Sequence, residues 1–136
     1  TQSIADAAEN ALTFDTELFD VGGFHTGSNS TFVVPTGGDG IYFITARTQF
    51  AANATGYRYI AIRVGGTNKN KCNHNYSSAP SGTIAQSVMV PCVLSLAATD
   101  SVDVVVFQNS GGALNVGSAG GVDTSATAKF EMVKLW

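Results

Sequence analysis

Glycine pairs divide this chain into short segments rich in β-branched and aromatic residues, and this punctuation constrains the fold more than any other feature. The pairs are Gly22-Gly23, Gly37-Gly38, Gly65-Gly66, Gly111-Gly112 and Gly120-Gly121. Between them, apolar and polar residues alternate over short stretches, which is typical of strands with one buried face. Turns at this spacing indicate an all-β sandwich or barrel.

Three segments carry the strand pattern most clearly: Gly40–Phe50, Tyr57–Val64 and Ser101–Gln108. In the second segment, Arg58, Ile60 and Ile62 share one face, while the tyrosines and Arg63 share the other. Gly65-Gly66 follows it and is expected to form a two-residue hairpin turn, because glycine accepts the positive φ that such turns require.

Pro91 interrupts the apolar run Ile84–Leu96. Proline has no N–H to donate to a sheet, so we expect this run to be an edge strand or to carry a bulge at Pro91. The alanine-rich stretch Ile4–Leu12 has too short an apolar stripe for a helix and is expected to be strand or loop.

Composition bounds the class of protein. The 136 residues predict one domain, and only 12% of them are charged, about half the usual share. A net charge of −3 argues against a nucleic-acid-binding protein, and no apolar run is long enough for a membrane helix. So little charge indicates either an interface with other subunits or a surface built from Ser, Thr, Asn and Gly.

Motifs that would indicate a catalytic or cofactor site are missing from the sequence. His25 and His74 stand far apart in turn-like surroundings. Asp15 and Glu17 could form a glycosidase-type carboxylate pair on one strand face, but a solvated strand face explains the same pattern and is favoured. We therefore expect no enzyme, no cofactor and no metal site.

The two cysteines, Cys72 and Cys92, leave two interpretations open. If Tyr76–Thr83 is a hairpin loop, the two lie opposite each other, and such neighbours can be bridged. The alternative is a pair of buried free thiols, which are common in intracellular proteins. With His74 they offer too few ligands for a structural zinc site.

Several segments, taken in order, resemble a known family. They are A-L-T-F-D-T-E-L-F-D at 11–20, F-V-V-P at 32–35, G-I-Y-F-I-T-A at 40–46, G-G-A-L-N-V at 111–116 and F-E-M-V-K-L at 130–135. The pattern resembles the C1q/TNF-like jelly-roll domain, in the microbial branch found in bacteriophage virion proteins and bacterial surface proteins. The resemblance covers residues 11–136, and residues 1–10 are expected to be an N-terminal arm or a first strand.

The resemblance implies a ten-stranded jelly-roll β-sandwich that assembles as a compact homotrimer and binds partners without catalysing a reaction. It gives five aromatic candidates for the trimer interface, each of which could equally lie in the core of one chain. These candidates are Tyr42, Tyr57, Tyr59, Phe107 and Phe130.

Within this family type, we expect a capsid decoration (cement) protein on the virion exterior. An initiator methionine is normally removed before a residue such as Thr1, and the chain shows no tail-fibre shaft, so we expect a whole gene product. Its trimer would bind the major capsid protein at local three-fold positions. Contact candidates in the N-terminal arm are Thr1, Gln2, Ser3, Ile4, Asp6 and Glu9.

The alternative is a receptor-binding tip domain of a phage tail fibre, or a bacterial surface adhesin. Such a domain would bind host glycan or surface protein through two apical loops, 68–81 and 111–123. Lys69 and Lys71 would contribute positive charge there. Neither alternative involves a nucleic acid or a membrane.

Overall fold

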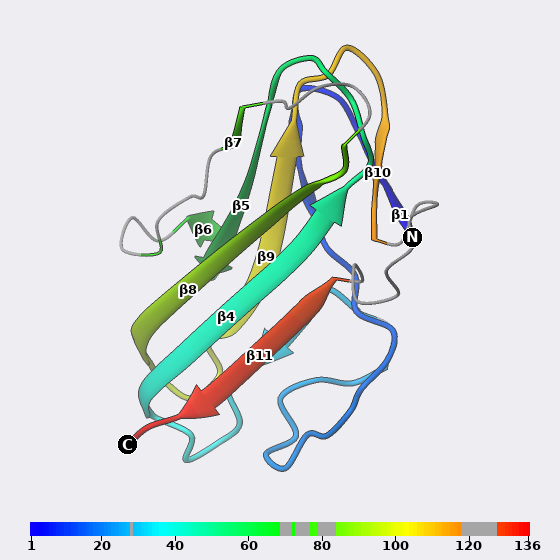
Figure 1. Ribbon diagram of the computed structural model, residues 1–136. Coiled ribbons are helices and arrows are strands. Elements are labelled where there is room, and N and C mark those ends of the chain that lie inside the picture. The colour runs from blue at the N-terminus through cyan, green and yellow to red at the C-terminus, as the bar shows by residue number, and fades with distance from the viewer. Residues whose placement is uncertain (28, 69–71, 73–76, 79–83, 118–127) are drawn as a thin grey trace.

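A computed structural model shows two antiparallel β-sheets packed face to face, so the chain is an all-β sandwich, as predicted (Figure 1). The structure describes residues 1–27, 29–68, 72, 77–78, 84–117 and 128–136. Sheet A contains β1 (Gln2–Ile4), β4 (Gly40–Phe50), β8 (Gln86–Leu96), β10 (Leu114–Val116) and β11 (Lys129–Lys134). Sheet B contains β2 (Ala8–Ala11), β3 (Thr31–Val33), β5 (Tyr57–Val64), β6 (Thr67–Asn68), β7 (Ser77–Ser78) and β9 (Ser101–Gln108).

Since β6 and β7 have two residues each, the described part of the chain has nine longer strands where ten were expected. The three clearest predicted strands are β4, β5 and β9, and each has the residue range predicted from the alternation of apolar and polar residues. The predicted turn is confirmed as well, because Gly65 and Gly66 join β5 to β6 with φ of 59° and 70°.

Pro91 lies on an edge strand, as its missing N–H predicted. In the described part of the chain, β8 pairs with β4 alone. The register runs without interruption, with Pro91 opposite Thr45, so there is no bulge. An edge strand tolerates this proline because one side of its backbone needs no partner.

The core lies between the sheets and is built by every second residue of the long strands. Residues such as Ile44 and Val90 in sheet A pack against Ile60 and Val104 in sheet B, and all four are fully buried. Burying a side chain of this size contributes about 1.5–3 kcal/mol. This apolar layer explains why alternation located the strands so well.

Tyr42 belongs to this core, which is one of the two places that the sequence left open for it, and it drops out of the trimer candidates. Its side chain is 0% exposed, and its hydroxyl donates a hydrogen bond to the Gly38 carbonyl. Burial, and to a lesser degree the nearby Asp39 carboxylate, raises the pKa of this hydroxyl above its ordinary value. A side chain enclosed in this way cannot contact a second subunit.

Residues 1–10 form strands and not a free arm. Ile4 is fully buried at the end of β1, which pairs with β10 in sheet A. The carboxylate of Asp6 accepts a hydrogen bond from the Gly111 N–H (2.9 Å). The segment then crosses to sheet B, where Glu9 lies opposite Phe107. Of the two forms expected for residues 1–10, the structure shows the first strand, and contact with a shell protein stays a prediction.

Candidate interaction surfaces

The outer face of sheet A is unexpectedly apolar. Along β4, residues that alternate with the core point away from it, and they meet outward residues of β8 and β11. Four large side chains on this face are between 40% and 56% exposed. We call them the sheet A face: Phe43, Met89, Val93 and Val133. Phe43 lies between Val93 and Val133 across the sheet, and Met89 lies further along β8 opposite Arg47. Exposed apolar side chains gathered on one sheet make this face a candidate interaction surface.

Charged residues border this apolar surface on one side. Lys129 of β11 lies opposite Arg47 of β4, and Glu131 lies opposite Thr45. Both signs of charge are therefore present at the rim, as is usual where an apolar interface centre meets solvent.

The outer face of sheet B holds three of the aromatic residues that were predicted for an interface. Phe107 stacks between Tyr57 and Tyr59, with ring centroids 5.3 and 5.0 Å apart. The Tyr59 hydroxyl donates a hydrogen bond to Glu9 (2.6 Å). These aromatic groups therefore contact one another within one chain.

An ion pair completes this face. Arg63 Nε donates to Asp103 Oδ1 (3.0 Å), its Nη2 pairs with Oδ2, and Glu9 lies 3.8 Å from its Nη1. The hydrogen bond to Asp103 outweighs the effect of burial and raises the pKa of the guanidinium. Tyr59, Glu9, Arg63 and Asp103 are thus paired with one another on the outer face of sheet B, whereas the sheet A face is apolar.

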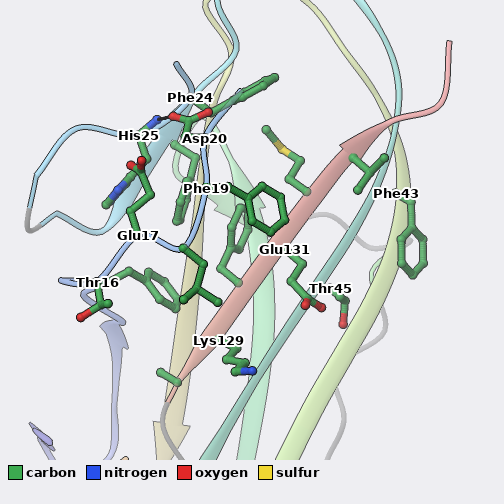
Figure 2. A pocket seen from close by; sticks show the side chains of 17 residues that line it. Thr16, Glu17, Phe19, Asp20, Phe24, His25, Phe43, Thr45, Lys129 and Glu131 are labelled. Atoms are coloured by element: carbon green, nitrogen blue, oxygen red, sulfur yellow. Dashed lines mark hydrogen bonds between the residues drawn. The ribbon is translucent and has the colours of Figure 1, made fainter. Parts of the chain in front are cut away.

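A groove runs between the loop 14–25 and β11 (Figure 2), with a volume of about 320 Å³. We call it the β11 groove. Its apolar lining includes Leu18, Phe19, Phe24, Phe130 and Val133, and its charged lining is Glu17, Asp20, Lys129 and Glu131. Leu18 and Phe19 are each 80% exposed, so the loop presents apolar side chains to solvent beside the groove.

Phe130, another predicted interface residue, lies at the inner wall of this groove. Its ring stacks on Phe32 at 3.8 Å and packs against Phe14 at 5.9 Å. It is partly buried against the core, so it does not belong to the outward sheet A face.

Asp20 organises the loop of the β11 groove. Its Oδ1 accepts hydrogen bonds from the N–H groups of Gly22 (3.2 Å) and Gly23 (2.8 Å), and its Oδ2 accepts from that of His25 (2.9 Å). Burial raises the pKa of this carboxyl, but the backbone hydrogen bonds outweigh burial and lower it overall. Asp20 therefore holds the loop as a carboxylate.

Asp15 and Glu17 lie outside any strand. The shared strand face is therefore absent, both for a glycosidase-type pair and for the solvated strand face that was favoured. Among the described residues, no three His, Cys, Asp or Glu side chains gather closely enough to hold a metal ion. The same part of the chain contains no helix that could span a membrane.

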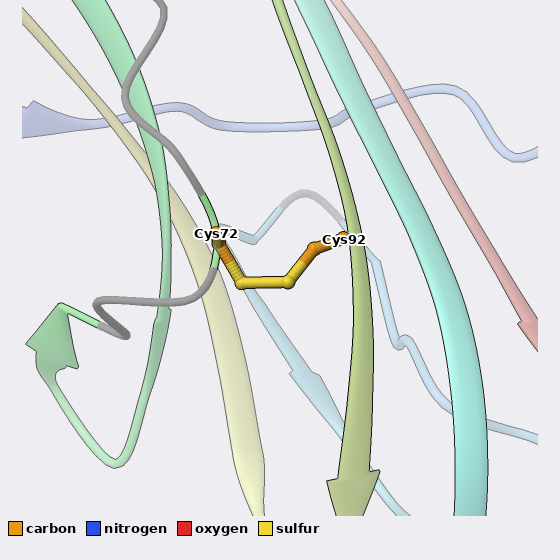
Figure 3. Close-up of a disulfide and its surroundings, with 2 residues drawn as sticks. All are labelled: Cys72 and Cys92. Atoms are coloured by element: carbon orange, nitrogen blue, oxygen red, sulfur yellow. A yellow bond between two sulfur atoms is a disulfide. The ribbon is translucent and has the colours of Figure 1, made fainter.

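A disulfide joins Cys72 to Cys92 inside the molecule (Figure 3), with Cα atoms 5.0 Å apart. Both side chains are buried. Cys92 lies opposite Ile44 on β4, so the two cysteines are not paired as cross-strand neighbours in a hairpin. Cys72 belongs to the connection between β6 and β7 of sheet B, and the bond therefore ties that connection to the edge strand of sheet A.

Most of the first loop proposed for a receptor-binding domain, 68–81, lies outside the described residues, including Lys69 and Lys71. In the second, 111–123, residues 111–117 are described, and Leu114–Val116 form β10 and not a loop. The four residues of the sheet A face were missed from the sequence, although β4 carries apolar residues in both phases of its alternation. That double pattern was the available signal, because a strand apolar on both faces is normally covered on both.

Comparison with known proteins identifies no family: the chain matches no protein-family model and no curated protein.

Proposed function

We propose that this chain is a non-enzymatic bacteriophage virion protein: a C1q/TNF-like jelly roll that assembles as a homotrimer and decorates the capsid exterior. The sheet A face is the observation that carries this proposal. A β-sandwich that is a monomer in water rarely exposes four large apolar side chains on one sheet.

A second copy of the chain is complementary to this face in both hydrophobicity and charge. The centre is apolar, and the rim has both signs of charge in Lys129, Arg47 and Glu131, so copies related by rotation can pair opposite charges. Completing the burial of each half-exposed side chain contributes about 1 kcal/mol. Further contacts around the rim are then needed to offset the entropy lost on association.

With the sheet A face inside a trimer, other surfaces stay available for a shell protein. Thr1 and Asp6 flank β1 and Ser3 lies within it, and all three side chains are exposed. They would touch the shell as parts of a rigid sandwich and not as an extended arm. Several identical contacts per trimer raise the strength of shell binding through multivalency.

Copy number in purified particles tests the decoration role. Quantitative mass spectrometry should find this chain in a fixed stoichiometric ratio to the major shell protein. A few copies per particle would favour the alternative of a receptor-binding tail tip. Absence from the particle would contradict both virion roles and leave the bacterial surface adhesin as the remaining candidate.

A further inference from the structure

We infer that the homotrimer closes head to tail, with the loop 14–25 of one copy packed on the sheet A face of the next copy. The contact joins the loop tip to the β8 half of that face. The loop tip is Leu18, Phe19 and Val21, and the β8 half is Met89 and Val93. The inference rests on the proposed function, because it takes the homotrimer as given and names the second surface of its interface.

Rotational symmetry requires two different surfaces from each copy. Copies related by a two-fold axis bury the same patch on both sides, whereas a closed ring of three joins one patch to a different patch on the next copy. The sheet A face supplies one of these patches. Outside the C-terminal Trp136, the loop tip holds the three most exposed large apolar side chains of the described chain, at 80%, 80% and 98%.

The loop 14–25 and the β8 half lie on opposite sides of sheet A, as a head-to-tail contact requires. In the sheet, β4 separates β8 from β11, and the loop lies beyond β11 (Figure 1). Phe43 and Val133 line the β11 groove beside this loop, whereas Met89 and Val93 do not. The β8 half is therefore farther from the loop of its own copy, and the loop of the next copy can cover it.

The loop tip also supplies apolar area that the sheet A face lacks. Phe43 is only 40% exposed, whereas Phe19 is 80% exposed. Apolar stabilisation grows with the area removed from water, so burial of Phe19 adds more than burial of Phe43. The loop tip is thus a source of the further contacts that must offset the entropy lost on association.

Charges beside the two surfaces are opposite in sign. Glu17 comes directly before the loop tip, and its side chain is exposed. On the sheet A face, Met89 lies opposite the exposed Arg47, which has Lys129 on its other side. When the loop tip covers Met89, Glu17 of one copy meets Arg47 of the next, and this ion pair sets the register of the two copies.

The shell protein is a less suitable occupant for the loop tip. If the tip bound the shell, another part of each copy would have to cover Met89 and Val93. In the described part of the chain, no other loop carries three exposed large apolar side chains. A second copy therefore satisfies both exposed surfaces with one contact.

Charge reversal in the whole chain tests the ion pair. Glu17→Lys or Arg47→Glu alone brings like charges together across the contact. Each should raise the concentration at which the three chains dissociate by about tenfold or more, measured by sedimentation equilibrium over a dilution series. The two substitutions together restore the opposite charges and the wild-type net charge of −3, and they should restore association.

Asp15→Lys is the matched control for Glu17→Lys. Asp15 is exposed on the same loop, and its substitution makes the same change of charge outside the inferred ion pair. Combined with Arg47→Glu, it also gives a net charge of −3 but should not restore association. Equal rescue by Asp15→Lys and Glu17→Lys would overturn the inference, because net charge and not position would then control association.

A loop-tip variant separates this inference from the proposed function. Phe19→Ser should weaken association by about tenfold or more, whereas Val33→Ser on sheet B should leave it unchanged. If wild type and Phe19→Ser form equally stable trimers, the inference fails and the homotrimer stands. A monomeric wild type would contradict the homotrimer itself. If Phe19→Ser stays trimeric but no longer binds purified shells, the loop tip is a shell contact and the inference is overturned.

Discussion

Phe43 on β4 lies directly opposite Val133 on β11, and both side chains point away from the core. Val93 on β8 continues this row on the other side of Phe43. One side of β4 thus packs into the sandwich while the other presents an apolar surface to solvent. Strands that are apolar on both faces are normally buried on both, and this is the reason for the proposal that a second copy covers this surface.

The disulfide should account for a large share of the stability. It closes a loop with a sequence separation of 20 residues, which corresponds to about 3 kcal/mol in the chain-entropy account. Replacing Cys72 and Cys92 together by serine should lower the free energy of unfolding by that amount, and the melting temperature by roughly 10 °C. Denaturant titration measures the change.

Reduced wild type is the control for this pair of substitutions. It should unfold at the same denaturant concentration as the double variant without reductant. If oxidised wild type and the double variant were equally stable, the bond would not contribute as described.

Asp20 should make the groove loop sensitive to acid. Its pKa lies below the ordinary value because backbone hydrogen bonds outweigh burial. Its hydrogen bonds therefore stabilise the fold above the unfolded pKa, and that contribution is lost as pH falls through the folded pKa. The amide chemical shifts of Gly23 and His25 should follow this titration, with a midpoint below the ordinary aspartate value.

Asp20→Asn is the matched control, since it keeps one acceptor oxygen and cannot titrate. Its Gly23 and His25 shifts should stay flat through the same pH range. A wild-type midpoint above the ordinary aspartate value would contradict the role given to these hydrogen bonds.

Tyr42→Phe should destabilise the fold although it changes a single atom. The substitution leaves the Gly38 carbonyl without its buried donor, at a cost of about 1–2 kcal/mol. Tyr59→Phe removes a hydroxyl bonded to Glu9 on an exposed face and should cost less than about 1 kcal/mol. Equal losses in the two variants would mean that burial of Tyr42 does not set the difference.

Alternation located the longest strands, because each of them buries every second residue in one core. Where both sets of alternate residues in a strand are apolar, the pattern could not say which set faces the core. Tyr42 and Phe43 show this: the sequence left Tyr42 open to either an interface or the core, and it lies in the core, whereas Phe43, the next residue, lies outside. Only the packing of sheet B against sheet A decides between the two faces.

Long-range contacts also could not be predicted from the local pattern of apolar and polar residues. Residues 1–10 carry too short an apolar pattern to predict two strands, and their places are fixed by β10 and β9, about a hundred residues later in the chain. The β11 groove likewise depends on the loop 14–25 lying beside β11. Of its acidic residues, Glu17 was noted from the sequence, but its neighbours at the other end of the chain were not.

Self-association through the sheet A face is the central claim, and a charge on that face tests it. Val93→Lys places an ammonium group on a valine that is 56% exposed and does not line the β11 groove. Val33→Lys is the matched control, because Val33 is 44% exposed on a strand of sheet B. Both substitutions are outward and should leave the fold intact.

Sedimentation equilibrium of the three proteins gives their masses in solution. The account predicts three chains per particle for wild type and Val33→Lys, and one chain for Val93→Lys. A monomeric wild type, or a Val93→Lys variant that still associates as three chains, would contradict it.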